Sequence, residues 1–131
     1  MKNIIIMLLL LILPFTATSC KGSEKMEKAE YHKIPANEAL YMMNNEEVTI
    51  VDVRRPDEYT LSHVPGAILV TNESIGSEPP AELPDKDAKI LVYCRSGRRS
   101  KEAAMKLLDL GYQNVYDFGG IIDWPYETTR N

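Results

Sequence analysis

The residues best suited to chemistry in this chain form one short segment, CRSGRRS, which begins at Cys94. A cysteine acts as a nucleophile through its thiolate, which nearby positive charge stabilises. Three arginines, Arg95, Arg98 and Arg99, surround Cys94 and provide that charge. Gly97 permits the backbone conformation that a tight loop needs. The segment therefore predicts a reactive sulfur.

The residues before and after this segment predict where the sulfur lies. The segment KILVY at residues 89–93, which is apolar after Lys89, predicts a buried strand, and a helical pattern follows the loop. Such a cysteine lies at the carboxyl edge of a sheet, where α/β folds bind ligands. We expect the amides of the loop, which includes Ser96 and Ser100, to turn inward as an anion-binding nest around a solvent-accessible thiolate. The alternative is that Cys94 is a small buried residue that ends a strand and only packs; a sulfur sealed in the core, or loop amides turned away from it, would favour this alternative.

The pattern along the chain predicts the elements that position this loop. Four apolar or β-branched runs predict strands at residues 48–53, 67–70, 89–93 and 115–118. Helical patterns cover residues 38–44 and 100–108, and a last helix is expected after Gly119 and Gly120. Residues 72–86 predict a surface loop with a short helical turn that can border the site. Strands separated by helices imply an α/β domain with a mostly parallel sheet covered on both faces.

Size and composition limit the possible functions. The 131 residues predict one domain, and a net charge of −4 argues against nucleic-acid binding, which requires basic patches. The chain has two cysteines, Cys20 and Cys94, so no disulfide framework holds the domain together. No residue pattern indicates a metal or an organic cofactor.

The N-terminus predicts export. Lys2, an apolar run over residues 4–13 and Pro14 indicate a signal peptide over residues 1–19, because a spanning helix needs about 20 apolar residues. Cys20 then resembles the lipid-modified cysteine of bacterial lipoproteins, which would anchor the chain at the cell envelope or in the periplasm; the alternative is a secreted or periplasmic protein with a stray cysteine. We expect residues 20–30 to form a polar tether, residues 31–127 to form the folded domain and residues 128–131 to form a C-terminal tail.

Five motifs in order resemble the signature of single-domain rhodaneses over about residues 31–127. They are residues 50–54, Glu58-Tyr59, residues 63–67, the CRSGRRS loop, and Gly119-Gly120 with Trp124. The resemblance implies a small doubly wound α/β fold around a central parallel sheet. It also implies a sulfurtransferase, in which Cys94 takes a sulfane sulfur from a donor such as thiosulfate and passes it from a persulfide to a thiol or cyanide. The alternative is a non-catalytic rhodanese module for partner binding or redox sensing.

The length of the cysteine loop distinguishes a rhodanese from the related cysteine phosphatases. Those enzymes use C-x-x-x-x-x-R, whose larger cradle fits a phosphate. Here Arg99 gives C-x-x-x-x-R, and Ser100 holds the place of the phosphatase arginine. The shorter loop suits a smaller sulfur centre.

The resemblance also implies roles for residues outside the loop. Asp52 matches an aspartate that ties neighbouring loops together, and Glu58 is expected to pair with Arg99 behind the cysteine loop. His63 is interpreted as a structural hydrogen-bonding residue, because an ionised cysteine needs no base.

Two arginines remain as candidates for binding the donor. Arg95 is the first side chain of the loop and can reach an anionic donor, and Arg98 is the second candidate. The sequence does not identify the sulfur donor or the sulfur acceptor, so the acceptor is either a small thiol or a protein. A membrane contact is expected only through a lipid on Cys20.

Overall fold

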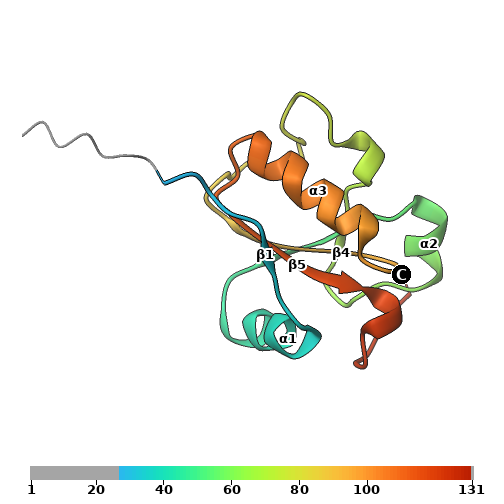
Figure 1. Cartoon of the computed structure of the whole chain (residues 1–131). Coiled ribbons are helices and arrows are strands. Elements are labelled where there is room, and N and C mark those ends of the chain that lie inside the picture. Colours follow the sequence, from blue (N-terminus) through green and yellow to red (C-terminus); the bar gives the residue numbers. More distant parts are fainter. Residues whose placement is uncertain (1–26, 131) are drawn as a thin grey trace, which may run out of the picture.

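The computed structural model describes residues 27–130, and it contains a five-stranded sheet in the order β1-β5-β4-β2-β3. All neighbouring strands run parallel (Figure 1). The strands are β1 (His32–Lys33), β2 (Thr49–Asp52), β3 (Ile68–Leu69), β4 (Lys89–Cys94) and β5 (Asn114–Gly120). The predicted signal peptide, Cys20 and most of the predicted tether lie outside the described residues.

Helices connect the strands and cover the sheet. They are α1 (Ala36–Asn45), α2 (Pro56–Leu61) and α3 (Arg98–Asp109), with 3-10 turns η1 (Asn72–Ser74) and η2 (Ile121–Asp123). Helices α1 and α3 lie on opposite faces of the sheet (Figure 1). No helix within residues 27–130 is long and apolar enough to cross a membrane.

The central strand β4 is apolar on both faces because each face is covered. Ile90, Val92 and Cys94 point into the cluster under α3, while Leu91 and Tyr93 point into the cluster under α1. Alternate residues of a strand face opposite sides, so a strand buried between two helical layers reads as a continuous apolar run. The predicted doubly wound α/β fold is confirmed.

Two helical elements differ from the sequence prediction. The helix expected after Gly120 is only the single turn η2, and it ends just before Trp124 because Pro125 cannot continue a helix and restricts the residue before it. Helix α2 was not predicted, because it is six residues long and buries none of them. Pro56 in its first turn, together with a hydrogen bond from the Arg55 amide to the Glu58 carboxylate (3.0 Å), starts it instead.

The end of the described chain packs against the domain. The His63 amide donates to the Thr129 carbonyl (3.0 Å), and the Thr129 amide donates to the His63 carbonyl (2.8 Å). Thr129 lies in the segment that was expected to be a tail. The packed structure therefore includes part of that segment.

Candidate active site

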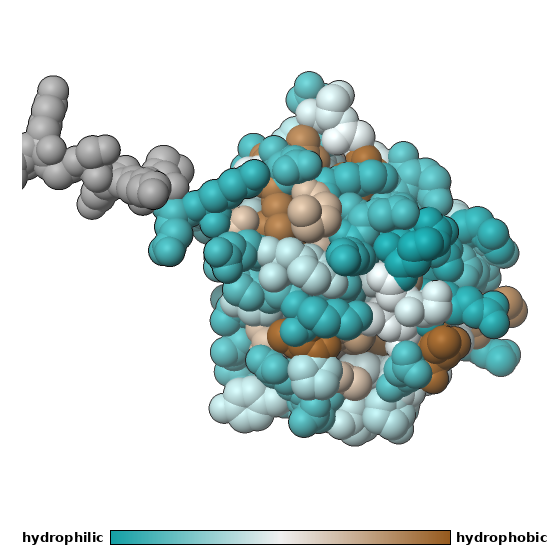
Figure 2. Space-filling model, in the orientation of Figure 1, coloured by the Kyte–Doolittle hydropathy of each residue, from teal (hydrophilic) through white to brown (hydrophobic). Residues whose placement is uncertain are grey.

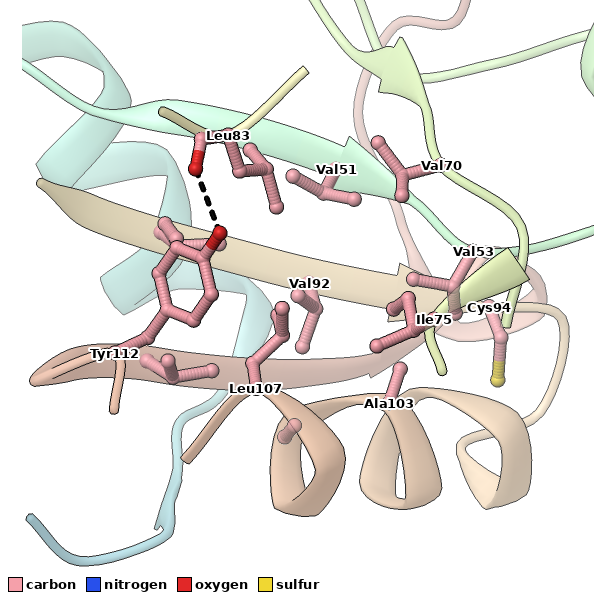
Figure 3. Close-up of a cluster of buried hydrophobic side chains, with 13 residues drawn as sticks. Val51, Val53, Val70, Ile75, Leu83, Val92, Cys94, Ala103, Leu107 and Tyr112 are labelled. Carbon is pink, nitrogen blue, oxygen red and sulfur yellow. Dashed lines mark hydrogen bonds between the residues drawn. The ribbon is translucent and has the colours of Figure 1, made fainter. Parts of the chain in front are cut away.

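Cys94 is the last residue of β4 and precedes a three-residue loop that leads into α3. Figure 3 shows its side chain pointing towards the first turn of this helix. The Gly97 amide donates a hydrogen bond to the Cys94 Sγ atom at 3.0 Å. Gly97 has a φ of 108°, a left-handed conformation that a side chain would disfavour. The backbone conformation of Gly97 thus turns its amide towards the sulfur.

Ser100 is the second polar contact of the sulfur. Its side chain is buried in the first turn of α3, and its Oγ atom lies 3.5 Å from Cys94 Sγ. The Ser100 hydroxyl also lies within reach of the carbonyls of Gly97 (3.1 Å) and Gly119 (3.4 Å). A hydroxyl both donates and accepts, so Ser100 can accept from a thiol or donate to a thiolate.

The predicted solvent exposure of the sulfur is wrong for this structure. Cys94 is 1% exposed and packs in the cluster under α3, because the alternation of β4 continues to its last residue. Above the loop lies a cavity of about 400 Å³, and the sulfur does not line it. Its walls come from α2 and the residue before it, from η1, from the cysteine loop and from the start of α3, and the lining residues are Arg55, Glu58, Glu73, Arg95, Ser96, Arg98 and Arg99.

The end of β5 supports the cysteine loop from behind. Val92 pairs with Asp117 but Cys94 pairs with Gly120, so β5 contains one additional residue at this point. The Ile122 amide donates to the Arg95 carbonyl at 3.2 Å. A Cβ atom on Gly120 would lie only 2.1 Å from that carbonyl oxygen, so no other residue fits here without movement.

Asp117 fixes this end of β5 and was missed by the sequence interpretation. Its buried carboxylate accepts hydrogen bonds from the Gly119 amide (2.9 Å) and the Tyr31 hydroxyl (2.6 Å). The Lys33 ammonium lies 3.8 Å away. The sequence did contain a signal for this role: Asp117 is an acidic residue inside a predicted buried strand, two residues before a glycine pair.

The ion pair expected between Glu58 and Arg99 is present. Two hydrogen bonds of 2.7 and 3.0 Å join the guanidinium to the carboxylate, and each side chain is 16% exposed. The hydrogen bond from Arg99 lowers the pKa of Glu58 to about 2. The pair joins α2 to α3 across one wall of the cavity, so it fixes the position of the cysteine loop relative to α2.

Asp52 ties three segments together at the carboxyl edge of the sheet. Its buried carboxylate accepts from the Arg54 guanidinium (2.7 Å) and from the Tyr93 hydroxyl (2.7 Å). Arg54 also donates to the Ser62 carbonyl (2.6 Å), and the Val64 amide donates to the Tyr93 hydroxyl (3.0 Å). Burial and the charge of Asp52 raise the pKa of Tyr93, so its hydroxyl stays protonated. Arg54 and Tyr93 carry this network, although the sequence interpretation gave neither a role.

His63 is buried beside α2. Its ring stacks on Tyr59 with centroids 3.8 Å apart, and its Nδ1 atom lies 2.8 Å from the Tyr59 carbonyl. Its backbone forms the bridge to Thr129. These contacts hold α2 against the end of the chain.

The two candidate arginines differ in their partners. The exposed Arg98 side chain forms an ion pair with Glu102, one turn along α3, at 2.8 Å. Arg95 is exposed and makes no ion pair with any of residues 27–130. Ser96 is exposed beside it. Arg95 is therefore the loop cation whose charge is least neutralised.

The arrangement combines a sulfur held by an inward amide with a cavity lined by four arginines. Such a lining favours a small anion, and a sulfur that accepts an N–H hydrogen bond can act as a nucleophile. Within the described range no group of three or more histidine, cysteine, aspartate or glutamate side chains could hold a metal ion.

Comparison with known proteins places this chain among the rhodaneses. The rhodanese-like domain family matches residues 35–125. Thiosulfate sulfurtransferase GlpE of Pseudomonas putida is 33% identical over 107 residues, covering 78% of this chain and 96% of the relative. Thiosulfate sulfurtransferase PspE of Escherichia coli is 37% identical over 73 residues, covering 56% of this chain and 70% of the relative.

Solved structures agree with these sequence matches. A rhodanese with anions from E. coli has a TM-score of 0.58 and 32% identity, covering 63% of this chain and 98% of that chain. A rhodanese-related protein from Thermoplasma volcanium has a TM-score of 0.67 and 26% identity, covering 77% of this chain and all of that chain. The chain therefore belongs to the rhodanese-like family, and the activity that this family membership supports is sulfur transfer.

Proposed function

We propose that this protein is a thiosulfate sulfurtransferase-like enzyme that carries sulfur as a persulfide on Cys94. The observation that carries the proposal is the Gly97 amide, 3.0 Å from the Cys94 sulfur, in a loop whose neighbouring residues Ser96 and Arg98 line a cavity with four arginines. An N–H group aimed at sulfur stabilises its negative charge, both in the thiolate and in the persulfide. The curated relatives support thiosulfate as the donor to test first, because they are named for it.

The reaction consists of two sulfur transfers. In the first, the Cys94 thiolate attacks the outer sulfur of thiosulfate; the sulfur–sulfur bond of the donor breaks, and sulfite leaves with the electron pair. In the second, a thiolate or cyanide attacks the outer sulfur of the persulfide, and the electron pair returns to Cys94. Both steps exchange one bond to sulfur for another, so no external oxidant or reductant takes part.

Arg95 is the residue that we propose to bind the donor. Its guanidinium is exposed at the cavity and lacks the acidic neighbour that neutralises Arg98. Arginine holds oxyanions through paired N–H groups, which suits the sulfonate end of thiosulfate. Because Cys94 is only 1% exposed, residues around the sulfur must move before the donor can reach it.

Thiocyanate formation tests this function. The purified domain is incubated with thiosulfate and cyanide, and intact-mass spectrometry follows the protein after thiosulfate alone. We expect turnover and a mass gain of one sulfur atom on Cys94. Cys94→Ser should lose both signals and keep the folded circular dichroism spectrum, because serine is close in size. If the unsubstituted protein shows neither signal, only the non-catalytic binding or sensing module is left.

We also propose that the protein acts at the cell envelope, attached through a lipid on Cys20. The support is the sequence of residues 1–20 alone. Cys20→Ser is expected to move the protein from the membrane fraction to the soluble fraction of the host envelope. Equal membrane association of both forms would contradict the lipid anchor.

A further inference from the structure

Lys33 lies behind the cysteine loop, at the end of the short edge strand β1. It pairs with Asp117 of β5, so the two side chains point to the same face of the sheet. That face is the one under α3, because Val115, two residues before Asp117, packs in the same cluster as Cys94. Strand β1 therefore places a lysine on the face that carries the reactive sulfur.

The Lys33 ammonium lies against the backbone that holds the sulfur. A Cβ atom on Gly119 would lie 2.9 Å from Lys33 Nζ, and a Cβ atom on Gly97 would lie 3.7 Å from it. Gly97 is the residue whose amide donates to Cys94 Sγ at 3.0 Å. Two covalent bonds separate that Cβ atom from the amide nitrogen, so the ammonium is no more than about 10 Å from the sulfur.

The charges at this point oppose one another. The buried carboxylate of Asp117 fixes the turn at Gly119, but its negative charge disfavours a negative sulfur nearby. The Lys33 ammonium, 3.8 Å from that carboxylate, offsets this charge. Burial raises the pKa of Tyr31, whose hydroxyl donates to Asp117, so this phenol adds no charge. Lys101 of α3 lies over the Tyr31 ring, with its Nζ atom 5.8 Å from the centroid.

The contact with Asp117 contributes little to stability. The Lys33 side chain is 53% exposed, and ion pairs with so exposed a partner add little to the free energy of unfolding. Figure 2 shows a mostly hydrophilic surface on the side where β1 crosses in front of β5 in Figure 1, so salt can screen the ammonium. The other cation that acts on the charge of Cys94 is Arg99, which Glu58 neutralises.

We propose that Lys33 is a positioning residue of the sulfur transfer: its ammonium offsets the charge of Asp117 and favours the anionic form of the Cys94 sulfur. The inference rests on the proposed function, in which Cys94 attacks as a thiolate. Lys33 acts through space and through the backbone at Gly97 and Gly119, and no bond to it forms or breaks. The same charge favours the persulfide, which is also anionic.

A titration of the Cys94 thiolate by its ultraviolet absorbance tests the proposal. The full chain carries Cys20→Ser, so that Cys94 is its only cysteine. Lys33→Met keeps an unbranched side chain and removes the charge. It should move the titration midpoint to higher pH by about 0.5 pH unit at low ionic strength, as expected for one charge at about 10 Å. Lys33→Arg keeps the charge and should keep the midpoint within about 0.2 pH unit. Thiocyanate turnover of Lys33→Met on the acid side of the midpoint should fall about threefold.

Lys89→Met is the matched control. Lys89 is also a strand lysine that pairs with a carboxylate, Glu46 at 3.0 Å, but it lies at the opposite end of β4 from Cys94. This variant changes the net charge equally and should move the midpoint by less than about 0.2 pH unit. Equal shifts in Lys33→Met and Lys89→Met would overturn the proposal, and so would a lower urea midpoint of Lys33→Met without a titration shift. Absence of thiocyanate turnover in the unsubstituted protein would instead remove the proposed function, while the titration still decides whether Lys33 acts on the sulfur.

Discussion

Gly120→Ala should displace the cysteine loop while leaving the sheet intact. The new Cβ atom would lie 2.1 Å from the Arg95 carbonyl oxygen and 2.7 Å from the Ser96 Cα atom. The first contact is 0.9 Å shorter than the 3.0 Å below which real Cβ contacts essentially never occur. Both contacts are with backbone, so the loop must move by a comparable distance. Overpacking of this kind costs about 1–3 kcal/mol.

The loss of activity should exceed the loss of stability. A misplacement of about 1 Å in a reactive group can slow catalysis about 100-fold. We therefore expect thiocyanate turnover to fall by about 10- to 100-fold, with a change in kcat rather than in KM for thiosulfate. The alkylation rate of Cys94 should also change, because the Gly97 amide moves away from the sulfur.

Gly76→Ala is the matched control for this measurement. A Cβ atom on Gly76 meets nothing within 4 Å, so this variant reports the effect of a glycine-to-alanine change without a clash. Urea unfolding and thiocyanate turnover are measured for both variants. Equal turnover and equal midpoints in the two variants would refute the argument that close approach of β5 positions the loop.

Three further substitutions test the supporting contacts. Because the pKa of Glu58 is lowered in the folded state, its carboxylate contributes at most about 3 kcal/mol to the free energy of unfolding, fully present above pH 4.5 and lost as the pH falls towards 2. Glu58→Gln should remove this contribution. Its urea midpoints at pH 7 and pH 3 should then differ less than those of the unsubstituted protein. Tyr93→Phe should cost about 1–3 kcal/mol in thermal unfolding, since the buried Val64 amide loses its acceptor; an unchanged melting temperature would contradict this. Asp117→Ala should slow turnover through kcat, by freeing the turn at Gly119; a purely structural role would lower stability and leave the kcat of the folded fraction unchanged.

Four of the five strands and the position of the cysteine loop could be predicted because their signals are local, whereas the two-residue strand β1 was missed. In the segment KILVY before Cys94, the four residues after Lys89 are apolar, which predicts a buried element. Gly97 and the helical stripe of α3 fix the loop in the same stretch of chain. Each of these sequence signals lies within a single strand, loop or helix.

The residues that support the cysteine loop act through contacts distant in sequence. Nothing near Cys94 shows that β5 has an additional residue, and nothing near Asp117 shows that Tyr31 will donate to it. Helix α2 was missed for a related reason. It buries none of its residues and is held by Arg99 of another helix, so it has no apolar periodicity to detect.

The shift in pairing between β4 and β5 also affects the order of folding. Gly120 lies 26 positions after Cys94, yet it is the backbone neighbour on which the cysteine loop rests. Contacts between distant positions form after local ones, because closing the intervening chain loses entropy. A newly made chain that has not yet docked its last strand would carry the cysteine without its support. The backbone support of the cysteine loop is therefore complete only after β5 has docked.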